Sequence, residues 1–198
     1  MGDVTAAMVA QLREMTGAGM MDAKRALIES VGDLEKAADF LRKSGIIKAG
    51  KKSERATNEG RVHSYVHGTG KVGVLVEVLC ETDFVARNEA FVALCNDLAM
   101  HIAASAPLYV TRVEVPMEMV VKEKEIYSGE MAGQGKPPEV MEKIIEGKLN
   151  KFFRDICLME QPFIKDEDKT VEEFIKEKIA TLGENIQVRR FSRLNLGT

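Results

Sequence analysis

The sequence lacks an excess of basic residues, a long apolar run and a paired set of cysteines. Its formal net charge is −3, so no global positive field favours direct binding to nucleic acid. No apolar run is as long as a membrane span, and the first residues resemble neither a signal core nor an arginine-rich transit segment. We therefore expect a protein with no membrane partner and no direct nucleic-acid partner.

The cysteines are few and widely spaced, at Cys80, Cys95 and Cys157. An odd number of cysteines, each within an apolar pattern, favours reduced thiols in a protein core over a disulfide framework. This usage predicts a cytoplasmic protein.

The sequence does contain the composition of a globular protein, with 198 residues, 45% hydrophobic and 30% charged. Residues 4–45 have the apolar spacing of three short helices, capped by Thr5 and Asp33 and separated by glycine turns, with the last ending at Ser44-Gly45. From Lys48 the hydrophobic periodicity stops and the residues become basic and polar. We predict a helical domain over residues 1–47, a basic linker over 48–57 and a core domain over 58–198.

The predicted core domain begins with a hairpin, Arg61–His67 and Lys71–Cys80, joined at Gly68-Thr69-Gly70. The second strand is apolar on both faces, which predicts that a second sheet, from another subunit, covers the face that helices leave bare. A short extended piece is expected at Leu108–Val113, a loop at 133–136 and a final strand at Ile186–Leu194. Four further helical patterns complete an α+β fold, in which a three-stranded antiparallel sheet packs against helices and pairs into a homodimer.

No pattern in the sequence indicates a catalytic centre or a cofactor. His63 and His67 lie four residues apart in a predicted strand, which separates their rings by roughly 13 Å, too far to share one metal ion. The segment Gly68–Lys71 is too short, and lies between two strands, so it does not match a phosphate-binding loop. We therefore expect a protein that works by binding, with no metal and no cofactor.

The most informative segment lies where the apolar run Val72–Cys80 ends in Glu81-Thr82-Asp83-Phe84-Val85, directly before a helical pattern. One interpretation is that Asp83 and Phe84 project from a rigid strand-to-helix corner as a probe for a partner. The other is that Thr82 or Asp83 caps the next helix and Phe84 packs into the core. The local pattern leaves both open.

Two segments together resemble the elongation factor Ts family: Leu12–Leu27, which includes Thr16-Gly17-Ala18-Gly19-Met20-Met21, and the corner segment Glu77–Arg87. Gly183–Arg190 is also similar to the final-strand segment of this family. The resemblance extends over nearly the whole chain and is closest to the short form with one core subdomain. One departure is Leu79, where the family usually has Asn. We expect this difference to alter packing under the corner and to leave the projecting Asp83-Phe84 pair intact.

The resemblance implies a non-enzymatic guanine-nucleotide exchange factor that promotes release of GDP from elongation factor Tu in the cytoplasm. It also implies that Phe84 enters an apolar crevice beside the magnesium site of that GTPase, with Thr82, Asp83 and Val85 forming the rest of the contact. Displacement of magnesium then weakens nucleotide binding, because the ion links the GDP phosphates to the protein.

The resemblance implies further contacts outside the corner. Leu12, Met20 and Met21 would contact the GTPase through the first domain, which is similar to a ubiquitin-associated domain. We expect one of the two methionines to be buried, because adjacent helical residues point in different directions. Leu182 would support Phe84, and His67 would lie near the partner.

Two hypotheses from other classes remain open. A peptide- or ubiquitin-binding scaffold would use the helical domain, with the core as an oligomerisation module, and would depend on Met20 and Met21 rather than on Phe84. An enzyme using Cys80 or His67 would require a thiol or imidazole in a formed pocket, and the apolar neighbours of Cys80 oppose this.

Overall fold

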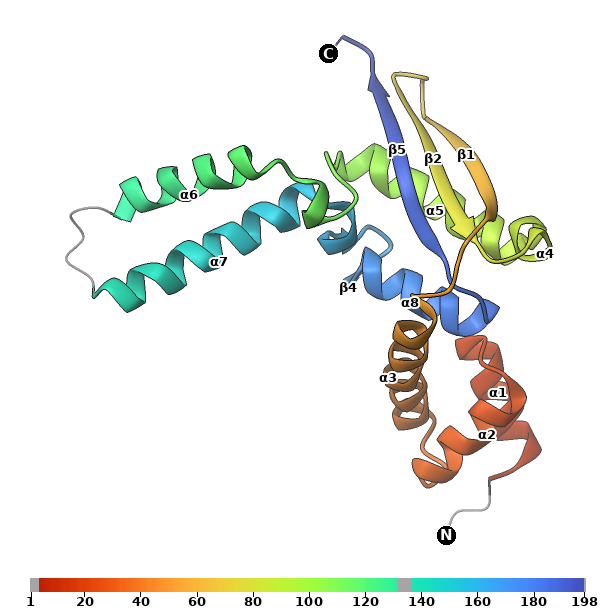
Figure 1. The fold of residues 1–198 in the computed structure, drawn as a ribbon. Helices are drawn as coiled ribbons and strands as arrows, with labels where there is room; N and C mark the ends of the chain where they lie inside the picture. Colours follow the sequence, from red (N-terminus) through yellow and green to blue (C-terminus); the bar gives the residue numbers. More distant parts are fainter. Residues whose placement is uncertain (1–3, 132–136, 198) are drawn as a thin grey trace. The chain divides into compact units, whose positions relative to one another are not determined.

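The computed structural model describes residues 4–131 and 137–197, apart from the side chains of residues 46–49 and 51 (Figure 1). The loop expected at 133–136 lies outside the described residues. The chain divides into two compact units. The first contains the residues up to His63 together with 77–97 and 173–189. The second contains residues 64–76, 98–172 and those from Arg190 onward.

Three helices open the chain, as the sequence predicts: α1 (Ala6–Thr16), α2 (Met20–Glu29) and α3 (Leu34–Lys52). Thr5 caps α1, since its side chain accepts a hydrogen bond from the Met8 amide at 3.3 Å. Asp33 caps α3 by accepting from the Lys36 amide at 3.0 Å. The predicted caps are therefore confirmed, and satisfy amides that have no partner within the helix.

The end expected for the third helix at Ser44-Gly45 is wrong, because α3 continues to Lys52. Gly45 is buried, and a Cβ atom there would lie 3.1 Å from Cβ of Ala180 in α8 (Val171–Leu182). Arg42, one turn earlier, lies 3.5 Å from the Glu177 carboxylate of the same helix. The glycine thus permits close packing of two helices and does not end one.

The predicted hairpin and final strand form one sheet, with strands β1 (Glu59–His67), β2 (Val72–Cys80) and β5 (Gln187–Asn195) in the order β1-β2-β5 (Figure 1). It is an antiparallel sheet packed against helices, which confirms the predicted α+β class. In β2 the alternate residues Val74, Val76, Val78 and Cys80 are buried, whereas Leu75, on the other of its two apolar faces, is 51% exposed.

Gly60 fixes how closely β1 approaches the end of β2. Its φ is +150°, and a Cβ atom there would lie 2.3 Å from the carbonyl oxygen of Val78. Only glycine fits at this distance without a shift of the backbone. The close approach holds the last residues of β2, from which the corner segment emerges.

Two long helices of the second unit, α6 (Met117–Met131) and α7 (Pro138–Ile156), lie side by side (Figure 1). Both match predicted helical patterns, as do α5 (Glu89–Ser105) and α8. The expected extended piece at Leu108–Val113 is wrong, because it contains a single bridge from Tyr109 to Cys157 followed by the 3₁₀ helix η1 (Arg112–Glu114). The short elements η2 (Leu158–Glu160), β3 (Pro162–Phe163) and β4 (Asp166–Thr170) were not predicted from the sequence.

None of the helices in the described part of the chain combines the length and the apolar character needed to cross a bilayer.

Candidate functional site

The corner after β2 is a capped helical turn. Thr82 precedes the short helix α4 (Asp83–Arg87), and its hydroxyl oxygen accepts a hydrogen bond from the Val85 amide at 3.4 Å. Asp83 and Arg87, one turn apart, form an exposed ion pair at 3.1 Å. The capping role that the sequence left open for Thr82 is therefore confirmed.

Phe84 does not fold back into the core. Its side chain is 82% exposed, whereas Ala86 in the same helix is buried and Val85 is half-buried. Helix α4 thus attaches through Ala86 and presents the Phe84 ring to solvent. A large apolar side chain exposed to this degree on a capped turn is available to a partner.

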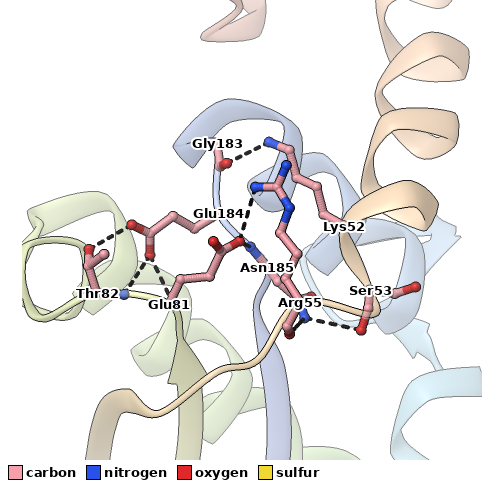
Figure 2. Close-up of polar contacts among 8 residues, drawn as sticks. All are labelled: Lys52, Ser53, Arg55, Glu81, Thr82, Gly183, Glu184 and Asn185. Atoms are coloured by element: carbon pink, nitrogen blue, oxygen red, sulfur yellow. Dashed lines mark hydrogen bonds and ion pairs between the residues drawn. The ribbon is translucent and has the colours of Figure 1, made fainter.

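The carboxylate of Glu184, just after α8, holds the corner in place (Figure 2). Its Oε2 accepts hydrogen bonds from the amides of Glu81, at 3.1 Å, and Thr82, at 3.0 Å. Its Oε1 accepts from the Thr82 hydroxyl at 2.6 Å. Three donors of the corner therefore converge on one side chain that is distant in sequence.

The neighbouring residue Asn185 joins the same corner to the segment that follows α3 (Figure 2). Its amide donates to Oε1 of Glu81 at 2.6 Å. Its buried side-chain Nδ2 donates to the carbonyl oxygens of Ser53, at 3.2 Å, and Arg55, at 2.8 Å. Lys52 adds a contact of 2.6 Å from its ammonium group to the carbonyl oxygen of Gly183.

Sequence reasoning missed Glu184 and Asn185 as parts of the site. The segment Gly183-Glu184-Asn185 carries only the signal of a helix end, a glycine followed by polar residues. The polar residues face partners more than a hundred positions away, and a single sequence contains no record of such pairing. The resemblance of Gly183–Arg190 to the family was the one sequence signal that this segment has a functional role.

The methionines of the helical bundle differ from expectation. Met20 is 56% exposed and Met21 is 74% exposed, so the prediction that one would be buried is wrong. Both lie in the first turn of α2, whose core contacts come from Ala23, Ala26 and Leu27 further along. Leu12 is fully buried in the same core cluster, so it supports the bundle from inside and does not itself reach the surface.

The two remaining candidates, His67 and Leu182, lie outside the corner segment in the sequence. His67 ends β1 and is exposed, with its Nδ1 2.9 Å from the hydroxyl oxygen of Tyr65. Leu182 is the last residue of α8 and is half-buried.

The three buried cysteines, among them the catalytic candidate Cys80, are unsuited to act as nucleophiles. Burial raises the pKa of Cys80 to about 11, and the nearby Glu184 carboxylate acts in the same direction. Burial likewise raises the pKa of Cys95 to about 12 and that of Cys157 to about 11. Each thiol therefore stays protonated at neutral pH, where a nucleophile would have to ionise. In the described residues, no group of three or more His, Cys, Asp or Glu side chains is arranged to hold a metal ion.

Comparison with known proteins gives a consistent result. The family model described as elongation factor TS matches residues 47–179. Elongation factor Ts of Geobacter sulfurreducens is 59% identical over 194 residues, which cover 98% of this chain and 90% of that protein. The protein of the same name from Acetivibrio thermocellus is 56% identical over the same shares. The chain therefore belongs to the elongation factor Ts family, the non-enzymatic nucleotide exchange factors of elongation factor Tu in translation elongation.

Proposed function

We propose that the corner Thr82–Val85 drives release of GDP from elongation factor Tu by inserting Phe84 beside the magnesium site of the GTPase. The observation that carries this proposal is the 82% exposure of Phe84 on a turn fixed by hydrogen bonds. A ring held in place before binding loses little conformational freedom when it enters a crevice. Asp83 accompanies the ring, and the intrusion shifts the groups that hold the ion.

The mechanism follows from linkage between two binding events. Magnesium connects the phosphates of GDP to the GTPase, so displacing the ion weakens nucleotide binding. The coupling is reciprocal, and a nucleotide that binds again must lower the affinity of the GTPase for this chain by the same factor. This chain then dissociates, which allows it to act on another GTPase molecule.

The size of the effect expected from Phe84 follows from its apolar surface. Burying one phenylalanine side chain contributes roughly 1.5–3 kcal/mol, and about 1.4 kcal/mol is a tenfold change in an equilibrium constant. The change Phe84→Ala should therefore slow factor-dependent GDP release by about one to two decades. Because the ring is exposed, the unfolding transition should not change.

Release of fluorescently labelled GDP from elongation factor Tu tests the proposal, with wild type, Phe84→Ala and Val113→Ala measured side by side. Val113 is 95% exposed and lies outside the corner, so its truncation controls for loss of an exposed apolar side chain. No acceleration by the wild-type chain would reject the exchange function itself. Equal acceleration by wild type and Phe84→Ala would retain the function and reject the wedge.

We further propose that Met20 and Met21 form a second contact with elongation factor Tu, supported from within the bundle by Leu12. The proposed organisation is a helical domain over 1–47 that binds the GTPase, a linker over 48–57, whose first residues up to Lys52 continue α3, and a core over 58–198 that carries the corner. His67 and Leu182 remain proposed parts of the partner surface. The scaffold hypothesis predicts instead that binding of a peptide or ubiquitin is lost in Met20 and Met21 variants and is unchanged in Phe84→Ala.

A homodimer formed through the sheet is the remaining proposal. Exposed apolar side chains lie on each strand: Val62 and Val66 on β1, Leu75 on β2 and Leu194 on β5. A second copy of the sheet would remove them from water. Sedimentation equilibrium should give a dimer for wild type and a monomer for Leu75→Asp, whereas Val121→Asp on α6 should leave the mass unchanged. A monomeric wild type would reject the dimer.

A further inference from the structure

We propose that Glu184 is a positioning residue for nucleotide exchange, whose carboxylate sets the orientation in which Phe84 meets the GTPase. This inference rests on the proposed function of the corner, and it assigns a role to a residue outside the segment Thr82–Val85. It is carried by the convergence of three corner donors on the two Glu184 oxygens (Figure 2).

Besides these contacts, Sγ of Cys80 donates to the carbonyl oxygen of Thr82 at 3.2 Å, and Oε1 of Glu81 accepts from the backbone amide of Asn185. Helix α4 contains five residues, and an isolated helix of that length is unstable in water. Ala86 is its one buried residue, and the exposed Phe84 ring gains little from packing. The direction of the ring therefore depends on the polar contacts of Glu81 and Thr82, which connect β2 to α4.

The Thr82 hydroxyl connects Glu184 to α4 through two hydrogen bonds. Because it donates its proton to Oε1 of Glu184, its oxygen lone pairs remain free to accept from the Val85 amide. The backbone carbonyl of Thr82 accepts from the Ala86 amide at 3.2 Å, which continues the turn. Removal of Glu184 thus frees the hydroxyl to rotate and weakens the cap of the helix that carries Phe84.

The Gly183–Asn185 turn also connects the corner to the start of the segment after α3. The backbone amide of Asn185 donates a hydrogen bond to the Glu81 carboxylate, and its side-chain Nδ2 donates to the carbonyl oxygens of Ser53 and Arg55. One short turn therefore holds both the base of the proposed wedge and the chain that leads from the helical bundle. A restraint of this kind lets Phe84 and the bundle surface be presented as one preorganised contact.

Amide hydrogen exchange of the free protein tests the restraint directly. In Glu184→Ala, the amides of Val85 and Ala86, which do not contact Glu184 themselves, should exchange about two- to thirtyfold faster, as expected for a lost helix cap. GDP release promoted by this variant should slow by a similar factor. Glu184→Gln, which keeps one acceptor oxygen, should lie between wild type and Glu184→Ala in both measurements, and Glu146→Ala, an exposed glutamate of α7, should match wild type.

A double-mutant cycle separates positioning from a general structural role. If Glu184 acts through the ring, Glu184→Ala should have no further effect on GDP release in a Phe84→Ala background. Equal slowing in both backgrounds would overturn the proposal, as would unchanged protection of Val85 and Ala86. If Glu184→Ala does not fold, unchanged exchange of the Val85 and Ala86 amides in Glu184→Gln would likewise overturn the proposal. The wedge itself fails separately, if Phe84→Ala leaves GDP release unchanged while the corner amides still respond to Glu184.

Discussion

Two polar networks hold distant segments together in this chain, one buried and neutral, the other nearer the surface and charged. In the second unit, buried His101 lies with its Nε2 3.0 Å from Oε1 of Gln161, and its Nδ1 accepts from the Ile164 amide at 3.2 Å. The Gln161 side chain donates to the carbonyl of Asp155 at 2.9 Å. In the first unit, distant segments are joined by hydrogen bonds to the carboxylates of Glu81 and Glu184.

The difference follows from the cost of burying charge. An ionised group away from water loses its hydration, so a fully buried network is built from an amide, an imidazole and backbone groups. A carboxylate that water still reaches can keep its charge and accept several strong hydrogen bonds. No buried side-chain nitrogen or oxygen in the described part of the chain lacks a hydrogen-bond partner. The buried network should therefore control stability, and the surface network the direction of a functional side chain.

The largest effect should come from breaking the buried network with Gln161→Leu. The leucine would leave Nε2 of His101 and the carbonyl oxygen of Asp155 without partners, and each unsatisfied buried group costs about 1–3 kcal/mol. We expect the free energy of unfolding in urea to fall by about 3 kcal/mol. The matched change is Gln187→Leu, because exposed Gln187 makes a single long contact of 3.4 Å to the Ser53 carbonyl. Equal losses for the two variants would contradict the comparison.

An intermediate effect is expected from pH. Burial lowers the pKa of His101 below its usual value, and the hydrogen bond to Gln161 opposes this only in part. Below about pH 6.5 the unfolded chain therefore binds a proton that the folded chain does not, so stability falls as pH falls, by up to about 1.4 kcal/mol per pH unit. Urea unfolding between pH 7.5 and 5.5 measures this slope. The slope should be smaller in His101→Leu, and an identical slope in both proteins would exclude His101 as its source.

The smallest effect should come from the exposed ion pair of the surface network, Arg55 with Glu81 at 3.5 Å. The Arg55 side chain is 54% exposed, so water and salt screen the attraction. Arg55→Ala should lower the free energy of unfolding by about 0.5 kcal/mol or less, and less still in 1 M salt. A loss as large as that of Gln161→Leu would show that the surface network also controls stability.

The sequence predicts much of the fold because local patterns carry it. Period-two spacing placed alternate valines on one face of β2, and helical spacing located the three N-terminal helices with the caps Thr5 and Asp33. The same reasoning placed a helix end at Gly45, since glycine often ends helices. There the decisive contact is with Ala180, far along the chain, and local spacing contains no trace of it.

In the candidate site, too, some features could be predicted from the local sequence and others could not. The abrupt change from apolar β2 to Thr82-Asp83-Phe84 marked the corner, and the threonine cap was one of the two roles considered for it. Whether Phe84 pointed inward or outward was undecided, because an aromatic residue after a strand is compatible with both. Met20 and Met21 were expected to differ in burial because adjacent helical residues point in different directions. Both are exposed, since a helix that begins at the edge of its bundle can expose two adjacent residues.

The local order of hydrophobic and polar residues determined most of the helices, the three strands of the main sheet and the caps Thr5 and Asp33, because these depend on neighbours a few positions apart. The family resemblance came from specific residues in the segments Leu12–Leu27 and Glu77–Arg87. Only the tertiary structure decided that Phe84 is exposed and that Glu184 and Asn185 hold its base. The physical reason is that hydrogen bonds between residues a hundred positions apart form only once the fold has brought donor and acceptor within reach.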